Sequence, residues 1–241
     1  LVPECETLSA AGFFAVVMYY RGVADAHFIP LCPIVVRPQH WVEEDVVYIF
    51  EESHRRREKT RKALGTASLR LQTGSLTFLG GVVTALIGPL ASIPLVATVL
   101  FPRLPAQIRR LFGRLVEAPQ VTQLKLERTD PTPGATDGQF GYTLEEMTGI
   151  VERLLRDLGL LSNFARIIVI TGHGSSSFNN PHESAYNCGA CAGSRGGPNA
   201  SAFARIANDL RVRDALSKRG LVLPQDTVFV GAFHNTCDDS V

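Results

Sequence analysis

The sequence has little excess charge and few cysteines, and both shortages exclude classes of function. Its 24 lysines and arginines nearly balance 23 aspartates and glutamates, which leaves a net charge of +1 over 241 residues. This balance offers no electrostatic basis for binding nucleic acid, so we expect no nucleic-acid partner. The five cysteines are odd in number and no signal-peptide pattern precedes them, which argues against a disulfide framework and for a reducing compartment.

The composition is that of a folded globular protein, with 45% hydrophobic and 20% charged residues. Because the chain begins at Leu1 and stops at Val241 without a tail-like composition, we expect a fragment of a larger protein. Residues 1–120 are predicted to be a mixed segment with a basic helix and an uncharged apolar helical region. Residues 121–241 are predicted to be an α/β segment.

Charge is absent between Arg70 and Arg103. This stretch, 71–102, is long enough for a membrane-spanning helix, which needs about 20 apolar residues. However, Pro89 and Pro94 interrupt it, because proline removes a backbone donor and clashes with the preceding turn. Basic residues also flank both ends, which leaves a single span without a preferred orientation. We therefore expect two shorter helices, buried or apposed to a membrane, instead of a span.

The remaining pattern predicts alternating strands and helices. The apolar run in 28–36 predicts a buried strand, and 43–64 predicts a helix with a basic second half. Residues 122–129 alternate as a strand does, and 130–141 read as a loop. Thr143 and Glu146 form a capping box for a helix. Its apolar stripe comprises Met147, Ile150, Val151, Leu154, Leu155 and Leu158.

The last hundred residues predict a parallel sheet. A strand over 165–171 ("ARIIVIT") is followed by a long polar loop, and then by a helix from about Asn199 to Arg219 that Gly220 ends. A second strand covers 226–236 ("DTVFVGAFHNT"). The order helix, strand, helix, strand is typical of α/β proteins.

The polar loop "TGHGSSSFNNPHESAYNCGACAG" (171–193) carries most of the reactive side chains. Ligands of α/β sheets bind outside the carboxyl ends of the strands. This loop and "FHNTCDD" follow the two predicted strands, so we expect both ends to line one crevice. His173 follows the first strand and Cys188 lies fifteen residues later; an imidazole and a thiolate together suit zinc.

Other readings stay open on these residues alone. A single histidine at a strand end is more often a structural, hydrogen-bonded residue, and Cys188 with Cys191 forms one CxxC without a second. "GHGSSS" does not match the G-x-S-x-G nucleophile pattern, so a hydrolase using a serine of 175–177 is the weakest candidate. The three other cysteines are expected to be structural: Cys5, Cys32 and Cys237.

The long motif "HGSSSFNNPHESAYNCGACAGSRGGPNASAF", with "LCPIVVRPQHWVEE" upstream and "FVGAFHNTCDD" downstream, resembles the DabA family of probable inorganic carbon transporter subunits. The resemblance covers almost the whole chain. It implies a parallel-sheet core like that of β-carbonic anhydrases with additional helices. It also implies a zinc ion and a DabB-like membrane partner similar to proton-conducting subunits.

The resemblance implies that His173 and Cys188 are zinc ligands of this chain. The family's other pair lies in a Cys-x-Asp-x-Arg motif, which these residues lack, since Glu6 and Thr7 follow Cys5. The catalytic Asp/Arg pair is therefore expected upstream. Candidates for orienting the ligands through hydrogen bonds are Asn180, His182 and Ser184, with Cys191 as a minor candidate.

The implied function is a zinc-binding subunit of an energy-coupled inorganic carbon uptake system, which hydrates CO2 to bicarbonate by a carbonic anhydrase-like mechanism. The alternative is a non-catalytic, zinc-stabilised scaffold subunit of a membrane complex. Either way, we expect a peripheral protein at the cytoplasmic face of the cell inner membrane. The 71–102 stretch would then be the surface that meets the membrane partner.

Overall fold

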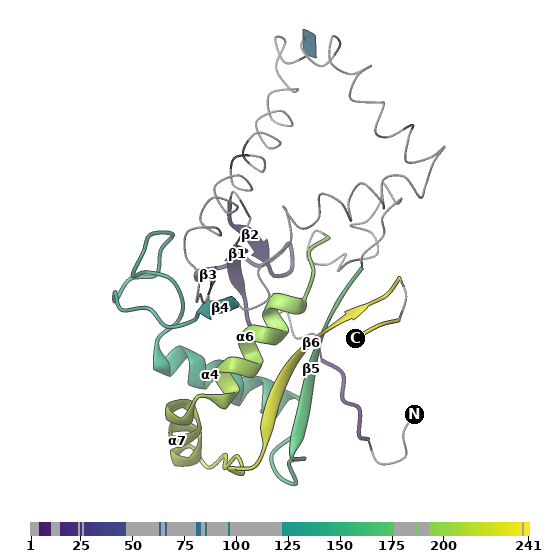
Figure 1. Ribbon diagram of the computed structural model, residues 1–241. Helices are drawn as coiled ribbons and strands as arrows, with labels where there is room; N and C mark the ends of the chain where they lie inside the picture. The colour runs from purple at the N-terminus through teal and green to yellow at the C-terminus, as the bar shows by residue number, and fades with distance from the viewer. Residues whose placement is uncertain are drawn as a thin grey trace. The chain divides into compact units, whose positions relative to one another are not determined.

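The computed structural model describes residues 5–10, 15–23, 25, 27–46, 63, 66, 81–82, 85, 96, 122–175, 187, 193–237 and 239–241 (Figure 1). The chain divides into two compact units. The first comprises Leu1–Tyr20, Ile29–Glu43 and Leu124–Val241, and the second Arg21–Phe28 and Glu44–Gln123. The division predicted at residue 120 stays a prediction.

A four-stranded sheet has the order β2-β1-β3-β4. Its strands are β1 (Met18–Arg21), β2 (Ile29–Leu31), β3 (Trp41–Val46) and β4 (Thr122–Lys125). β1 and β2 pair in antiparallel fashion, with Met18 opposite Leu31, and both side chains are buried. The predicted strands in 28–36 and 122–129 are thus confirmed in part of their length.

The predicted helix over 43–64 is wrong at its start, because its first four residues belong to β3. The Lys125 ammonium of β4 donates a hydrogen bond to the Glu43 carboxylate at 3.1 Å. Such cross-strand pairing outweighs the weak helical preference of the local sequence. Beyond Val46 the prediction lies outside the described residues, apart from the helical Ala63.

The apolar stretch 71–102 also lies outside the described residues, apart from the four helical positions 81, 82, 85 and 96. Among the residues that the structure describes, no helix combines the length and apolar character needed to cross a bilayer.

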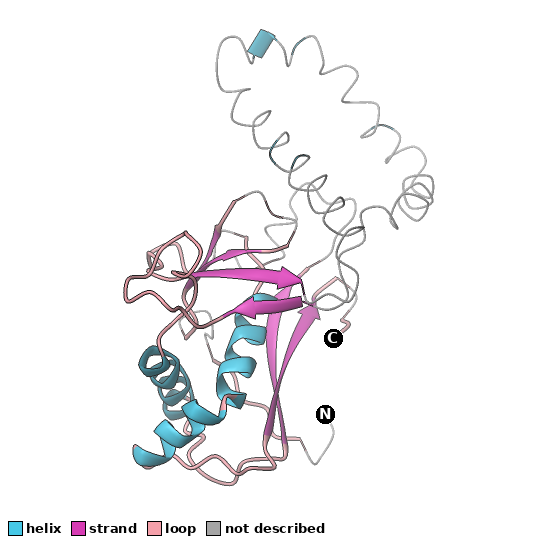
Figure 2. Ribbon diagram, turned by 60° about the vertical axis from the view of Figure 1, so that its left-hand side comes forward, coloured by secondary structure: helices cyan, strands magenta, loops and turns pink. Residues whose placement is uncertain are grey.

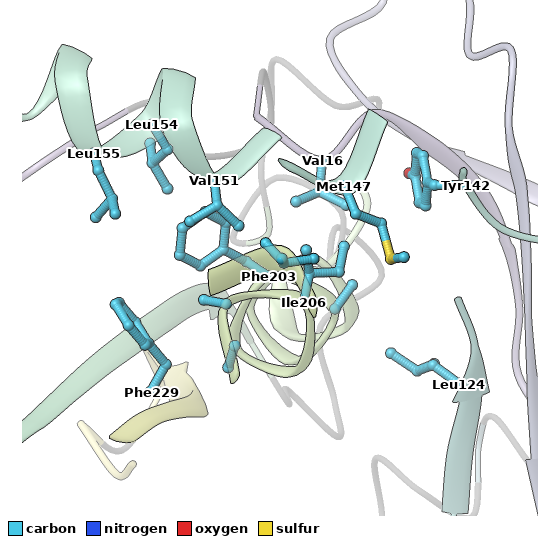
Figure 3. Close-up of a cluster of buried hydrophobic side chains, with 14 of the residues drawn as sticks. Val16, Leu124, Tyr142, Met147, Val151, Leu154, Leu155, Phe203, Ile206 and Phe229 are labelled. Atoms are coloured by element: carbon cyan, nitrogen blue, oxygen red, sulfur yellow. The ribbon is translucent and has the colours of Figure 1, made fainter. Parts of the chain in front are cut away.

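Helix α4 (Leu144–Asp157) begins with the predicted capping box. The Glu146 N–H donates to the Thr143 hydroxyl at 3.2 Å, and the Thr143 N–H donates to the Glu146 carboxylate at 2.7 Å. The predicted stripe is confirmed as well. Its buried members are Met147, Val151, Leu154 and Leu155, and its partly buried members are Ile150 and Leu158. Figure 3 shows the four buried members of this stripe facing Phe203, Ile206 and Phe229 across the core.

The single helix predicted from Asn199 to Arg219 is wrong, because two helices occupy this stretch: α6 (Gly197–Asn208) and α7 (Leu210–Lys218). Asp209 between them is extended, and its carboxylate accepts a hydrogen bond from the Arg211 N–H at 2.8 Å. An aspartate that caps a new helix in this way ends the preceding one. The predicted stop at Gly220 is confirmed, with a left-handed φ of 82°.

The two remaining strands, β5 (Ile167–Gly174) and β6 (Val228–Asn235), form the predicted parallel pair (Figure 2, long magenta arrows). One face of this pair packs against α6, where the Phe203 and Phe229 rings meet edge to face at 6.1 Å. The other face carries four exposed aliphatic side chains: Ile167, Val169, Val228 and Val230. The mixed α/β class with a parallel sheet is therefore confirmed.

A charged cluster joins α4 to the segments before it. The Arg128 guanidinium, only 4% exposed, makes two bonds to the Glu146 carboxylate, at 2.7 and 3.0 Å. His40 Nε2 lies 3.2 Å from the same carboxylate. Burial alone would raise the pKa of Glu146, but bonds from Arg128, the Thr143 N–H and His40 lower it to about 2.

Replacing Glu146 by Gln should lower the free energy of unfolding by roughly 1–3 kcal/mol at neutral pH, because the buried Arg128 loses its charged partner. A carboxylate with a lowered pKa stabilises the folded state above its ordinary pKa of 4.5 and loses this effect as the pH falls towards 2. The two proteins should therefore converge in acid, as measured by urea unfolding across this pH range.

The control is Asp157→Asn, which removes an exposed pair in which Arg153 lies 3.8 Å away. It should change the free energy of unfolding by less than about 0.5 kcal/mol. Equal effects of the two substitutions at neutral pH would contradict the role given to Glu146.

Candidate functional site

His173 lies at the carboxyl end of β5 with its side chain exposed. Because side chains alternate along a strand, His173 projects to the face opposite α6, whereas Gly172 and Gly174 face the helix. Its neighbour in the register of the parallel pair is His234 of β6. Two imidazoles therefore leave the same face of the sheet at neighbouring positions, on strands that lie about 4.8 Å apart.

The start of α6 is fastened to this strand end. The Gly196 N–H donates a hydrogen bond to the His173 carbonyl at 2.8 Å. A Cβ atom at Gly172 would overlap the backbone of Gly196 and Gly197, which cannot move aside as a side chain can. Glycine at this position permits the close approach, and the approach in turn fixes the backbone that carries His173.

The polar loop is tied back beside His173. The Ser175 N–H donates to the Asn187 side-chain oxygen at 2.6 Å, and both residues are buried. Asn187 directly precedes Cys188 in the sequence. This bond therefore joins a residue next to Cys188 to a residue two positions after His173.

The other predicted site residues lie outside the described residues: Asn180, His182, Ser184, Cys188 and Cys191. Ser175, one of the serines considered as a nucleophile, is fully buried, which does not suit a residue that must reach a substrate. Cys32 is buried as expected of a structural cysteine, and this burial raises the pKa of its thiol. The thiols of Cys5 and Cys237 are exposed, so core packing gives them no structural role.

The end of β6 turns back on itself beside the end of β5. The Thr236 N–H and hydroxyl both donate to the Gly174 carbonyl at 2.9 Å, which joins the two strand ends. The turn brings the Asp239 carboxylate to His234, with 2.8 Å between Oδ1 and Nε2. The two strand ends are thus side by side, whereas the expectation that both line one crevice stays a prediction.

A cavity of about 290 Å³ runs along β5 and includes His173 in its lining. Its lining includes His173, Ser194 and Arg195 together with apolar residues of the core: Leu31, Leu154, Leu158 and Phe203. A mostly apolar cavity with a few polar groups suits a small molecule.

The sequence motifs did not identify His234, Asp239 or Asn187 as site residues. One signal pointed to His234, because it lies near the end of its predicted strand as His173 does. Asp239 approaches His234 only through the turn that follows β6, which no motif indicates. Within the part of the chain that the structure describes, no three histidine, cysteine or acidic side chains gather closely enough to hold a metal.

Comparisons with known proteins agree over the whole chain. The model of the family described as "Probable inorganic carbon transporter subunit DabA" matches residues 1–241. The chain is 52% identical over 241 residues to the protein named "Probable inorganic carbon transporter subunit DabA 2" of Rhodopirellula baltica, covering 100% of the chain and 22% of that relative. No solved structure matches.

More distant relatives carry the same name. The "Probable inorganic carbon transporter subunit DabA" of Methylococcus capsulatus is 41% identical over 253 residues, covering 100% of the chain and 23% of the relative. That of Geobacillus is 34% identical over 239 residues, covering 98% and 27%. The chain thus spans about a quarter of the length of the curated relatives it matches.

Gly172→Ala should lower the free energy of unfolding by several kcal/mol, because the added methyl group would overlap the backbone of Gly196 and Gly197. Costs of this size are seen in severely overpacked cores. Thermal unfolding followed by circular dichroism measures the effect.

The matched control is Gly149→Ala in α4, where the added methyl group enters open space. It should stabilise by up to about 1 kcal/mol through helix propensity. A Gly172→Ala protein as stable as the parent would contradict the close approach of α6.

Proposed function

The chain belongs to the DabA family of probable inorganic carbon transporter subunits, and on that basis we propose that it carries part of a zinc site that hydrates CO2 to bicarbonate. His173 and Cys188 are the proposed ligands from this chain. Since the chain spans 22% of its relative from Rhodopirellula baltica, the activity belongs to a longer protein. The proposed core is that of a β-carbonic anhydrase with additional helices.

The observation that carries this proposal is the hydrogen bond between Ser175 and Asn187. It holds the chain next to Cys188 close to the chain that follows His173, although the two candidate ligands are fifteen residues apart in the sequence. An exposed imidazole and a thiolate are a donor pair that zinc accepts in tetrahedral geometry. The residues present therefore fit two positions of a zinc site.

Two protein ligands do not complete such a site, and the described residues contain no cluster of three. The proposal therefore needs the cysteine and the aspartate of a Cys-x-Asp-x-Arg motif from elsewhere in the longer protein. Its arginine would pair with the aspartate and so free one metal position for water.

When bound, zinc lowers the pKa of a coordinated water towards about 7 and so supplies hydroxide at neutral pH. In this proposal, the residues of this chain hold the metal and offer a space for the substrate. His173 offers a ring nitrogen from a backbone fixed by Gly196. The largely apolar cavity along β5, whose lining includes His173, would accept CO2, a small molecule without net charge or dipole.

Metal analysis of the full-length protein tests the zinc site. We expect near-stoichiometric zinc in the parent protein and a large loss in His173→Ala and Cys188→Ser. His27→Ala and Cys5→Ser are the matched controls and should keep the metal. If zinc is absent, or if it survives both ligand substitutions, the proposal is wrong.

The same preparation separates an enzyme from a scaffold. X-ray absorption should find a metal position filled by exchangeable water, and the complex should hydrate CO2. Zinc with four protein ligands, no exchangeable water, and carbon uptake that survives loss of the Asp/Arg pair would favour a non-catalytic, zinc-stabilised scaffold.

For location, we propose peripheral docking at the cytoplasmic face of the inner membrane, through a DabB-like proton-conducting partner. Support comes from the transporter subunit named by the family and from the uncharged 71–102 stretch with basic residues on both sides. Such a surface suits a partner helix or anionic headgroups.

Expression of the full-length protein with and without the partner tests this location. The protein should sediment with membranes only when the partner is present, and an alkali wash should release it. Retention in alkali-washed membranes without a partner would instead indicate an integral protein.

A further inference from the structure

His234 is the feature of this site to which neither the motifs nor the family name gives a role. We propose that His234 is a positioning residue: Asp239 holds its imidazole beside His173, and its Nδ1 accepts a hydrogen bond from the hydroxyl group of bicarbonate bound at the metal. This inference rests on the zinc site proposed above.

The sheet register provides the first support. His173 and His234 are paired residues of neighbouring parallel strands, so their side chains project to one face and start about 4.8 Å apart. His234 is 31% exposed, which leaves part of its ring open to a ligand on that face. A group bound at His173 can therefore contact His234, either directly or through one small molecule that lies next to His234.

The turn after β6 provides the second support. It is closed by two backbone bonds at 2.9 Å, from the Asn235 N–H to the Ser240 carbonyl and from the Asp239 N–H to the Asn235 carbonyl. Asp239 takes a left-handed φ of 59° there. A non-glycine residue held in that region is uncommon and costs conformational energy. Asp239 is itself exposed, so this backbone geometry, rather than burial, places its carboxylate on His234.

The hydrogen bond to Asp239 fixes the tautomer of His234. An ionised carboxylate can only accept hydrogen bonds, so Nε2 carries the hydrogen in the 2.8 Å contact. In the neutral ring, Nδ1 then keeps a free lone pair, and none of the described residues bonds to it.

A lone pair at Nδ1 discriminates among small anions. Bicarbonate has an O–H to donate to it, whereas azide has no hydrogen. His234 should therefore strengthen the binding of bicarbonate and leave the binding of azide unchanged.

The test uses the full-length protein with cobalt in place of zinc. Its visible absorption reports the binding of each anion, at a pH well above the ordinary imidazole pKa of about 6.5. In His234→Ala, the bicarbonate dissociation constant should rise about 2- to 10-fold, the effect of one lost hydrogen bond, while that of azide stays within a factor of two. Asp239→Ala should act in the same direction, because the tautomer is no longer fixed.

Two further variants keep the test sound if His234→Ala folds poorly. Asn places an amide oxygen near the position of Nδ1, so His234→Asn should recover part of the bicarbonate affinity, whereas His27→Ala should change neither anion. If bicarbonate and azide weaken equally, or if neither changes while His173→Ala still loses the metal, this inference is wrong and the zinc site stands. If His173→Ala keeps its metal, the proposed function fails first.

Discussion

The contact between α6 and the parallel strands β5 and β6 is the constraint on which the rest of the first unit depends. Gly172 and Gly231 permit it, because a Cβ atom at Gly231 would lie 2.7 Å from the Ser201 Cα and one at Gly172 would overlap Gly196. With the helix this close, Phe203 meets Phe229 in the core and the Gly196 N–H reaches the His173 carbonyl. The same few atoms thus close the core and fix the strand end that carries the candidate ligand.

The two faces of the parallel pair β5 and β6 have different surroundings. One face supplies Phe229, and the partly buried Ile168 and Ile170, to the core shared with α4 and α6. The other face carries exposed aliphatic side chains along most of its length, Ile167 being 66% exposed, and two histidines at its carboxyl end. Parallel sheets are usually covered on both faces. Among the described residues, the histidine face keeps exposed aliphatic side chains, whereas the apolar side chains of the other face are buried or partly buried.

Local signals in the sequence predicted the parts of the fold that local interactions decide. The capping box at Thr143 and the apolar stripe of α4 needed only side chains within a few turns of one another, and β5 and β6 were evident as apolar runs. The strand at Glu43 depends on Lys125, far away in the sequence. The break between α6 and α7 depends on the Asp209 carboxylate, which caps the start of α7. In the site, His173 stood in a conspicuous motif, whereas Asp239 and His234 meet only through the geometry of a turn.

The bond between Ser175 and Asn187 also bears on the number of residues that separate the two proposed ligands, His173 and Cys188. It joins residues twelve positions apart in the sequence, and the entropy of closing a loop grows only slowly with its length. Insertions or deletions between these two anchors should therefore leave the bond between Ser175 and Asn187 intact. The number of residues between His173 and Cys188 is then a poor guide for recognising or redesigning such a site. The presence of Ser175 and Asn187, which bond to each other, is a better guide.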